Sequence, residues 1–418
     1  MMNNGGGKIY IKRTLEGMIN KFLHSPEIIA ILGARQVGKT TLMRKIYDTV
    51  SLKKIFLDFE DQEICSLFDE DPKGFAQLYL ESTEVVFIDE FQYSKKGGPN
   101  LKFLFDKYGT KFLISGSSSL DITIRAISSL VGRVFALELF PLSFEEFIEY
   151  KDPELSRILK DRFERKEPIH TSFHRQLFEY LQEFVIWGGY PRVAVSESVE
   201  EKYEVLKNIF ITYLLKDVRG FFRLATESNM HKLTRLLALQ VGNLIRYNEL
   251  SSASELSYSA LKNHLKILEE TYIVKLLKPF YTNKRLEVTK NPKVYFIDTG
   301  LRNYVCRDFR SWDVRTDKGS LIENFLCAEF AKRSLEFNYW RTKSGGEVDF
   351  VVQSPVGVIP IEAKAGDRPK PGRAFYSFIE KYKPLSGYLF YGGPMGKKEH
   401  LGISINFVPL YALHLVEF

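Results

Sequence analysis

Short apolar runs alternate with amphipathic stretches along the N-terminal part of the chain. The apolar runs predict strands at Ile28–Leu32, Lys54–Phe59, Val85–Ile88, Lys111–Ser115 and Val134–Leu139. The run at Val85–Ile88 is wholly apolar, which is typical of a parallel strand that is buried on both faces. Because helical stretches separate these strands, the pattern predicts an α/β sandwich built on a parallel sheet.

The pattern becomes mostly helical after Phe140–Ser143. It stays helical to about Val218 and is interrupted at Trp187–Pro191, where two glycines and a proline break the periodicity. We therefore expect a helical lid that follows the α/β region and could cap its site.

A different arrangement is expected from residue 229 onward. Helical periodicity is present at Lys232–Val241, near Tyr247–Ser252 and, most strongly, at Tyr258–Glu270, and an apolar run follows at Tyr272–Leu277. Two helices across a tight connection, followed by a β-hairpin, predict a winged helix-turn-helix.

The last part of the chain predicts a second α/β region. A helix is expected at Leu321–Ser334, and strands are expected at Asn338–Arg341, Glu347–Gln353 and Val358–Ala363. The expected domains are the α/β core, the helical lid, the winged helix-turn-helix and the C-terminal α/β domain, at residues 1–142, 143–228, 229–296 and 297–418.

Composition and charge exclude few classes of protein. A chain of 418 residues is long enough for several domains, and a net charge of +7 is compatible with nucleic-acid binding without requiring it. The cysteines Cys65, Cys306 and Cys327 have no metal-ligand spacing. No apolar run approaches the ~18 residues that cross a bilayer, so we expect a cytoplasmic protein without a membrane partner and set aside a transporter subunit.

The strand at Ile28–Leu32 leads into a glycine-rich stretch and a helix, which is the setting of a P-loop. Glycines allow successive N–H groups to point inward, so that the backbone and the helix dipole hold the phosphates of ATP. The predicted nucleotide-binding residues are Gly33, Ala34, Arg35, Gln36, Val37, Gly38, Lys39, Thr40 and Thr41. In this motif Lys39 reaches the β- and γ-phosphates and the Thr40 hydroxyl binds Mg²⁺.

The pair Asp89–Glu90 closes the apolar strand that follows the P-loop in the chain, as a Walker B pair does. We expect Asp89 to contribute to the Mg²⁺ shell and Glu90 to polarise the attacking water. Gln92 is a candidate contact of the γ-phosphate or of that water.

Two further catalytic candidates follow. Ser117, just after the strand at Lys111–Ser115, is the predicted γ-phosphate sensor, although Ser118 or Ser119 can equally cap the next helix. Arg133 is the candidate arginine that stabilises charge at the nucleotide, either in its own chain or across a subunit boundary, and the opposing interpretation is a solvated surface arginine.

Taken together, these motifs resemble those of a known family. The P-loop at 33–42, the Walker B segment Val86–Gln92, the Val131–Arg133 stretch, the segment Phe140–Phe147 and Trp187–Pro191 are similar to those of prokaryotic AAA-type ATPases with a C-terminal domain of unknown function. The resemblance implies an AAA-like P-loop core, a winged helix and a nuclease-like C-terminal domain.

The winged helix can be interpreted in two ways. Polar and basic residues lie at the exposed start of its recognition helix, where they can contact phosphates and base edges of DNA. These residues are Ser257, Tyr258, Ser259, Lys262, Asn263 and Lys266. A protein-binding or interdomain module is the other interpretation, and Glu269 and Glu270 do not favour DNA contact.

The C-terminal region carries a second set of candidate catalytic residues. Glu362 and Lys364 share one face of a strand, on which they would point toward Asp349 of the neighbouring strand, and Glu323 lies on the preceding helix. The carboxylates Glu323, Asp349 and Glu362 are candidate Mg²⁺ ligands, and Lys364 would orient or help to deprotonate the attacking water. The arrangement resembles the PD-(D/E)xK nuclease fold, although Val348 stands where that pattern often has proline.

The sequence thus supports two hypotheses. The first is an ATP-hydrolysing AAA-type protein that couples nucleotide state to DNA binding and carries a Mg²⁺-dependent nuclease-like domain, with homo-oligomer formation as an open expectation. The second is a nucleotide-dependent switch or scaffold whose C-terminal domain recognises a partner without cleaving it.

Overall fold

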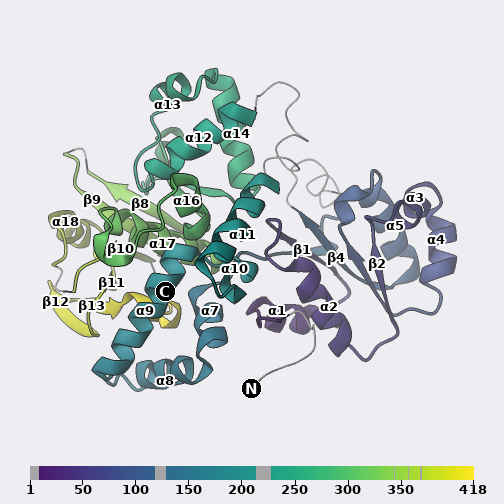
Figure 1. The fold of residues 1–418 in the computed structure, drawn as a ribbon, viewed down its shortest axis with the longest axis horizontal. Helices are drawn as coiled ribbons and strands as arrows, with labels where there is room; N and C mark the ends of the chain where they lie inside the picture. Colours follow the sequence, from purple (N-terminus) through teal and green to yellow (C-terminus); the bar gives the residue numbers. More distant parts are fainter. Residues whose placement is uncertain (1–8, 118–128, 213–226, 343, 356, 368–369) are drawn as a thin grey trace. The chain divides into compact units, whose positions relative to one another are not determined.

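The computed structural model divides the chain into two compact units (Figure 1). The first contains Met1–Pro141 with Glu270–Tyr272, and the second contains Leu142–Glu269 with Ile273–Phe418. The residues that the structure describes are 9–117, 129–212, 227–342, 344–355, 357–367 and 370–418. The break between the units lies one residue before the predicted end of the α/β core, whereas the three regions predicted after it form one compact unit.

The first unit is built on a five-stranded sheet in the order β2-β3-β4-β1-β5, and every strand pair in it is parallel (Figure 1). The strands are β1 (Ile28–Gly33), β2 (Lys54–Asp58), β3 (Val85–Asp89), β4 (Lys111–Ser117) and β5 (Val134–Glu138). The helices are α1 (Leu15–Phe22), α2 (Lys39–Thr49), α3 (Gln62–Glu70), α4 (Pro72–Tyr79), η1 (Phe91–Tyr93) and α5 (Gly97–Tyr108). The predicted α/β fold with a parallel sheet is confirmed.

The second unit begins with helices, as the sequence predicts. They are α7 (Phe144–Lys151), α8 (Pro153–Glu164), α9 (Thr171–Trp187), α10 (Pro191–Val195) and α11 (Val199–Thr212). Ser143 starts α7 with a capping box, in which Glu146 N–H donates to Ser143 Oγ (3.2 Å) and Ser143 N–H donates to Glu146 Oε2 (3.0 Å). The ring of Phe144 packs against Phe184 of α9 and Phe325, so this helical block shares its core with the C-terminal part of the same unit.

Two glycines at the end of α9 mark a close crossing of backbones. A Cβ atom on Gly189 would lie 2.3 Å from the carbonyl oxygen of Leu142, and one on Gly300 would lie 1.9 Å from that of Trp187. The buried carboxylate of Asp298 accepts a hydrogen bond from Gly189 N–H (2.7 Å) at the same place. The Trp187–Pro191 motif is thus explained by packing, because no side chain fits at the crossing.

A segment of helices with two paired strands follows within the second unit. It contains α12 (Glu227–Leu239), α13 (Tyr247–Ser254), α14 (Tyr258–Glu270) and the antiparallel strands β6 (Val274–Leu277) and β7 (Lys293–Phe296), with α15 (Lys284–Thr289) between the strands. A bridge between Leu244 and Lys293 adds a third extended segment to this small sheet. The predicted helices are present, and the predicted hairpin is formed by β6 and β7.

The C-terminal part of the unit holds a six-stranded sheet in the order β12-β13-β11-β10-β9-β8 (Figure 1). The strands are β8 (Phe337–Arg341), β9 (Glu347–Ser354), β10 (Gly357–Ala363), β11 (Ser386–Tyr391), β12 (Gly396–His400) and β13 (Ile403–Pro409). The remaining elements are α16 (Thr299–Cys306), η3 (Trp312–Val314), α17 (Lys318–Lys332), α18 (Arg373–Tyr382) and η4 (Leu410–Leu415).

Helices α17 and α18 cover opposite faces of this sheet. Phe330 of α17 packs on Phe337 of β8, whereas Phe378 of α18 packs on Trp340 of the same strand. Residues an odd number of positions apart in a strand point to opposite faces, so the two helices lie on either side. The chain therefore runs from α17 through three antiparallel strands and α18 to the parallel strand β11.

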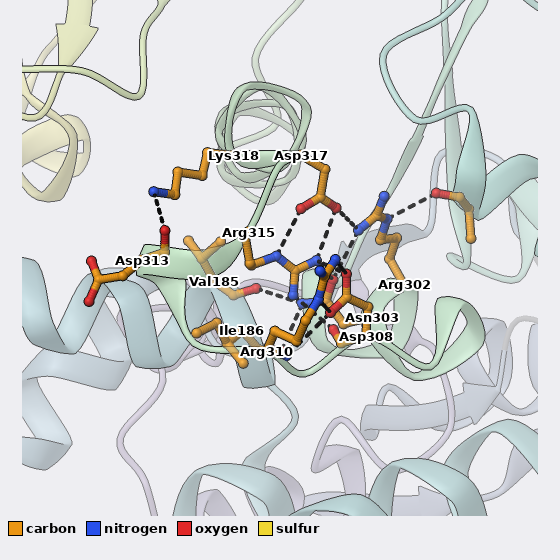
Figure 2. A network of polar contacts seen from close by, with 11 residues as sticks. Val185, Ile186, Arg302, Asn303, Asp308, Arg310, Asp313, Arg315, Asp317 and Lys318 are labelled. Atoms are coloured by element: carbon orange, nitrogen blue, oxygen red, sulfur yellow. Dashed lines mark hydrogen bonds and ion pairs between the residues drawn. The ribbon is translucent and has the colours of Figure 1, made fainter.

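A buried polar network fixes the start of α17 (Figure 2). The Asp317 carboxylate accepts hydrogen bonds from Arg315 (2.9 and 3.0 Å) and from Arg302 (2.6 Å). Arg302 also donates to the carbonyl oxygen of Ala238 in α12, and the side chain of Asn303 donates to carbonyl oxygens in the last turn of α9. The network thus joins α9, α12, α16 and the start of α17 within the second unit.

Candidate functional sites

The loop between β1 and α2 has the backbone geometry of a phosphate-binding turn. Gly33 has φ of 155°, and a Cβ atom there would lie 2.1 Å from the carbonyl oxygen of Leu139. Gly38 has φ of 99° directly before α2, a left-handed conformation that glycine adopts without a steric penalty. The loop consequently brings its N–H groups to the start of α2, where an anion is favoured.

Lys39, the first residue of α2, lies across this loop. It is only 6% exposed, and its Nζ donates hydrogen bonds to the carbonyl oxygens of Gly33 (2.9 Å) and Ala34 (2.8 Å). Thr40 is half-buried and Thr41 is exposed. The predicted cationic side chain is therefore held at the loop, and the residues present fit the triphosphate of ATP.

Arg13 supports the loop from outside the motif, and the sequence reasoning missed it. Its buried guanidinium donates to the carbonyl oxygen of Val37 (2.9 Å) in the loop and to that of Phe140 (2.6 Å) after β5. Nothing in its local sequence signals this role, because its acceptors are backbone atoms distant in the chain.

The Walker B residues lie at the carboxyl end of β3, two strands from β1 in the sheet. Asp89 is 2% exposed and accepts hydrogen bonds from Ser115 Oγ and from Glu90 N–H (3.1 Å). Glu90 has φ of 52° and its N–H also approaches Ser115 Oγ (3.3 Å). The Gln92 amide donates to the Glu90 carboxylate. Asp89 and Ser115 thus contact the backbone of Glu90, and Gln92 holds its carboxylate.

Ser115 of β4 contacts the Walker B residues and is 1% exposed. It lies two residues before Ser117, the predicted γ-phosphate sensor. Ser117 ends β4 and pairs with Gly33 of β1, so its backbone lies beside the P-loop, while its side chain and the alternatives Ser118 and Ser119 lie outside the described part of the structure.

Arg133 lies away from the P-loop of its own chain. It directly precedes β5, whose start is paired with Ile28 at the start of β1, so Arg133 lies at the amino edge of the sheet. Its guanidinium forms two hydrogen bonds with the Asp106 carboxylate of α5 (2.7 and 3.2 Å). The geometry does not bring Arg133 together with Lys39 and Glu90 within one chain.

A β-bulge shapes the second candidate site. Between the pairs Asn338–Val351 and Trp340–Val348, β9 has one more residue than β8, and the extra residue falls next to Asp349. Bulges re-aim side chains and are common beside active sites. Asp349 Oδ2 accepts a hydrogen bond from Ala363 N–H of β10 (2.8 Å), so its carboxylate leans toward the strand that carries Glu362.

Glu362 and Lys364 interact directly, as their shared strand face predicts. Lys364 Nζ lies 3.5 Å from Glu362 Oε2, and Gly372 N–H donates to both Glu362 oxygens (3.2 and 3.0 Å). Burial and the negative charge of Asp349 raise the pKa of Glu362, against the opposing charge of Lys364. Burial alone would lower the pKa of Lys364, but the surrounding carboxylates outweigh it and raise the pKa, which favours a charged, orienting lysine over a base.

Glu323 joins this group from α17. Burial and the negative charges of Asp349 and Glu347 raise the pKa of Glu323 to about 7, although Lys293 opposes them. Tyr295 donates a hydrogen bond to Glu323 Oε2 (3.3 Å), and Lys293 Nζ lies 3.8 Å from the same oxygen. Lys293 and Tyr295 belong to β7, and no local sequence pattern indicates that this strand reaches the C-terminal acidic residues.

The predicted carboxylates do not form a three-ligand cluster. Within the described residues, no three His, Cys, Asp or Glu side chains are close enough together to hold a metal ion. Mg²⁺ nevertheless uses one or two carboxylates and keeps several waters. Asp349 and Glu362 are oxygen donors of the right kind. Burial and, to a smaller extent, the charge of Asp349 raise the pKa of Glu362, and a bound cation would offset both effects.

All of the candidate DNA-contacting residues on or next to α14 are exposed. These residues are Ser257, Tyr258, Ser259, Lys262, Asn263 and Lys266. The ammonium group of Lys262 lies 4.6 Å from the centre of the Tyr258 ring, and Leu261, Leu265 and Leu268 form the buried face of the helix. The structure thus separates a polar, basic face from an apolar one, as the periodicity predicts.

Comparison with protein families agrees with the core assignment. Residues 25–148 match the AAA domain family, residues 178–311 match a domain of unknown function (DUF8612), and residues 318–413 match a second domain of unknown function (DUF4143). The segment at 25–148, most of which lies in the first unit, is therefore similar to AAA-type P-loop ATPase domains.

Similar proteins extend over most of the chain. An uncharacterized protein of Methanocaldococcus jannaschii is 25% identical over 338 residues, which are 78% of this chain and 72% of that protein. An uncharacterized protein of Mycobacterium tuberculosis is 24% identical over 88% of this chain and 77% of its own length. Among solved structures, the Walker-type ATPase PABY2304 of Pyrococcus abyssi shares 15% identity, with 71% of this chain and 96% of that chain covered, at a TM-score of 0.47. A search of the described residues finds no helix long and apolar enough to cross a membrane.

Proposed function

We propose that this protein binds and hydrolyses ATP and that its nucleotide state controls the binding of DNA by the second unit. The observation that carries the proposal is that a P-loop and the Asp89–Glu90 residues lie at the carboxyl ends of β1 and β3 in one parallel sheet. Lys39 is held at the carbonyl oxygens of that P-loop. In open parallel sheets, ligands bind at this edge.

In this proposal each residue has a separate task. The loop N–H groups and Lys39 bind the phosphates, Glu90 orients the attacking water, and Gln92 and Ser115 hold the Walker B carboxylates in position. Thr40 and Asp89 would hold Mg²⁺, which shields the charge of the phosphates when it is bound with ATP. In the expected homo-oligomer, Arg133 would serve a neighbouring copy rather than its own chain.

DNA binding is proposed for the segment α12–β7. The order of helices and strands supports a winged helix, and the exposed face of α14 carries Lys262, Asn263 and Lys266. The C-terminal part is proposed as a PD-(D/E)xK-like domain, which the order of its helices and strands and the proximity of Asp349, Glu362 and Lys364 support.

The ATPase proposal is tested by phosphate release from ATP. Lys39→Ala should abolish ATP binding and turnover, whereas Glu90→Gln should keep ATP binding and lower turnover at least ~100-fold, because it removes only the group that orients water. Lys53→Met, a change of an exposed lysine on the same unit, is the control. Turnover by the Lys39 and Glu90 variants at the rate of the parent protein would refute the site assignment.

A switch or scaffold without cleavage is the second candidate function. The observation that favours it is that both Glu362 oxygens already accept hydrogen bonds from Gly372 N–H and that no three-ligand group is gathered among the described residues. Incubation of the parent protein and of an Asp349→Ala/Lys364→Ala variant with DNA, Mg²⁺ and ATP separates the two functions. Cleavage by the parent alone supports a nuclease, and no cleavage by either protein supports the switch.

A further inference from the structure

Lys293 is a buried cation that enters the C-terminal acidic site from another part of the fold. It starts β7, its side chain is 3% exposed, and its ammonium group forms an ion pair with Glu347. The same Nζ lies 3.8 Å from Glu323 Oε2. Glu347 is two residues before Asp349 in β9, so Lys293 lies beside Glu323, itself a candidate Mg²⁺ ligand, and beside an acidic residue close to Asp349.

The strand that carries Lys293 is tied firmly to α17. The side chain of the fully buried Asn324 accepts a hydrogen bond from Phe296 N–H (2.8 Å) and donates one to Phe296 O (2.7 Å). Gly242, whose N–H donates a hydrogen bond to Val294 O of β7 (2.9 Å), approaches Glu323 so closely that a Cβ atom there would lie 3.1 Å from Glu323 Oε2. The position of the ammonium group is therefore set by the α12–β7 segment and not by a flexible surface side chain.

Carboxylates outnumber cations around the site even with Lys293. Glu323, Glu347, Asp349 and Glu362 supply carboxylates, and Lys364, directly after β10, supplies a cation. A fixed ammonium group among these carboxylates reduces the negative potential that attracts a divalent cation, and it does so strongly because the group is removed from solvent.

We propose that Lys293 is a resident cation of the C-terminal acidic site and that it limits how tightly this site binds a divalent cation. The inference rests on the proposed PD-(D/E)xK-like function of the C-terminal domain, with Asp349 and Glu362 as the oxygen donors for its divalent cation. An ion pair that only stabilises the fold would involve Lys293 and Glu347. Lys293 also lies beside Glu323, so its charge acts on a carboxylate of the acidic site as well. The divalent-cation affinity of the C-terminal site thereby becomes dependent on β7, a strand of the segment proposed to bind DNA.

The test is Mn²⁺ binding to the full-length protein without nucleotide, measured by titration calorimetry. Lys293→Met and Lys293→Gln both remove the charge, and glutamine keeps an N–H donor for Glu347, so it guards against misfolding. Each should bind Mn²⁺ on the order of tenfold more tightly than the parent protein. Lys293→Arg should stay within about threefold of the parent protein because it keeps the charge.

Two controls make the result specific. Lys332→Met removes another buried lysine of the second unit, which is paired with Glu329 at 2.9 Å, and should leave the Mn²⁺ affinity unchanged. Asp349→Ala should abolish the binding that belongs to this site. If Asp349→Ala removes Mn²⁺ binding but neither uncharged Lys293 variant binds more tightly, the role of Lys293 is refuted while the metal site stands. If Asp349→Ala binds like the parent protein, the metal assignment falls and this inference falls with it.

Discussion

Replacement of Arg13 by methionine tests whether a residue outside the nucleotide-binding motif holds the P-loop in place. The guanidinium donates to Val37 O at 2.9 Å and to Phe140 O at 2.6 Å, and the side chain is 5% exposed. Methionine preserves most of the apolar contact of the arginine stem but leaves both carbonyl groups without this donor.

The magnitude follows from these two contacts. A hydrogen bond from a charged donor contributes about 1.5–3 kcal/mol, so the loss of two should destabilise the first unit by about 3 kcal/mol or more. If the P-loop is less ordered, part of the free energy of ATP binding is used to order it, and each ~1.4 kcal/mol used in this way weakens ATP binding tenfold. We expect ATP affinity to fall at least about tenfold, and Arg13→Lys, which can reach one carbonyl group, to give an intermediate value.

Two measurements on the full-length protein check this expectation. Equilibrium titration gives the ATP affinity, and hydrogen exchange followed by mass spectrometry should show faster exchange in the peptide that covers 33–42. Lys53→Met is again the exposed control. ATP affinity and loop exchange equal to those of the parent protein would show that Arg13 does not position the loop.

Three further predictions address other parts of the molecule. Ser115→Ala should lower ATP turnover about tenfold or more with little change in ATP affinity, because Ser115 Oγ contacts Asp89 and Glu90 N–H. Steady-state kinetics measures both quantities, and a loss of affinity without a loss of turnover would contradict this prediction. Burial, together with Lys160 and Arg333, lowers the pKa of His414 to about 3. The folded state therefore takes up a proton less readily than the unfolded chain. Protonation of the unfolded chain consequently lowers the free energy of unfolding as pH falls from about 6.5 toward 3. His414→Phe removes this titrating group, so its free energy of unfolding in urea should fall about 3 kcal/mol less between neutral pH and pH 4.5 than that of the parent protein. An equal fall in the free energy of unfolding for both proteins would refute the assignment. Gly300→Ala should destabilise the second unit by about 3 kcal/mol or more because its Cβ would overlap Trp187 O, whereas Gly319→Ala, where a Cβ meets no atom within 4 Å, should be neutral or slightly stabilising in thermal unfolding.

The AAA-type core was predictable because its signals are local. The P-loop needs glycines, a lysine and a flanking strand and helix in direct succession, and all of them lie between Ile28 and Thr49. The Asp89–Glu90 pair is likewise recognised from the apolar strand that it closes. The helical block, the helices of the α12–β7 segment, and the C-terminal helix α17 with strands β8, β9 and β10 were also predicted, since each depends on hydrophobic periodicity within a short window.

Contacts between distant segments were not predictable. The contact of Ser115 with the Walker B pair depends on how β4 pairs with β3, which no local pattern reports. Arg13 binds backbone carbonyl groups, which have no sequence signature. The place of Arg133 at the amino edge of the sheet follows from the parallel pairing of β5 with β1.

The sequence by itself therefore determined the fold class and the phosphate-binding motif, because short-range spacing and periodicity encode both. Only the tertiary structure decided which side chains surround each site. A bulge aims Asp349 toward β10, and the packing of β7 on α17 brings Lys293 to Glu323 and Glu347. The physical reason is that long-range packing sets the electrostatic environment of a buried carboxylate, and the residues that create it need not be near it in the chain.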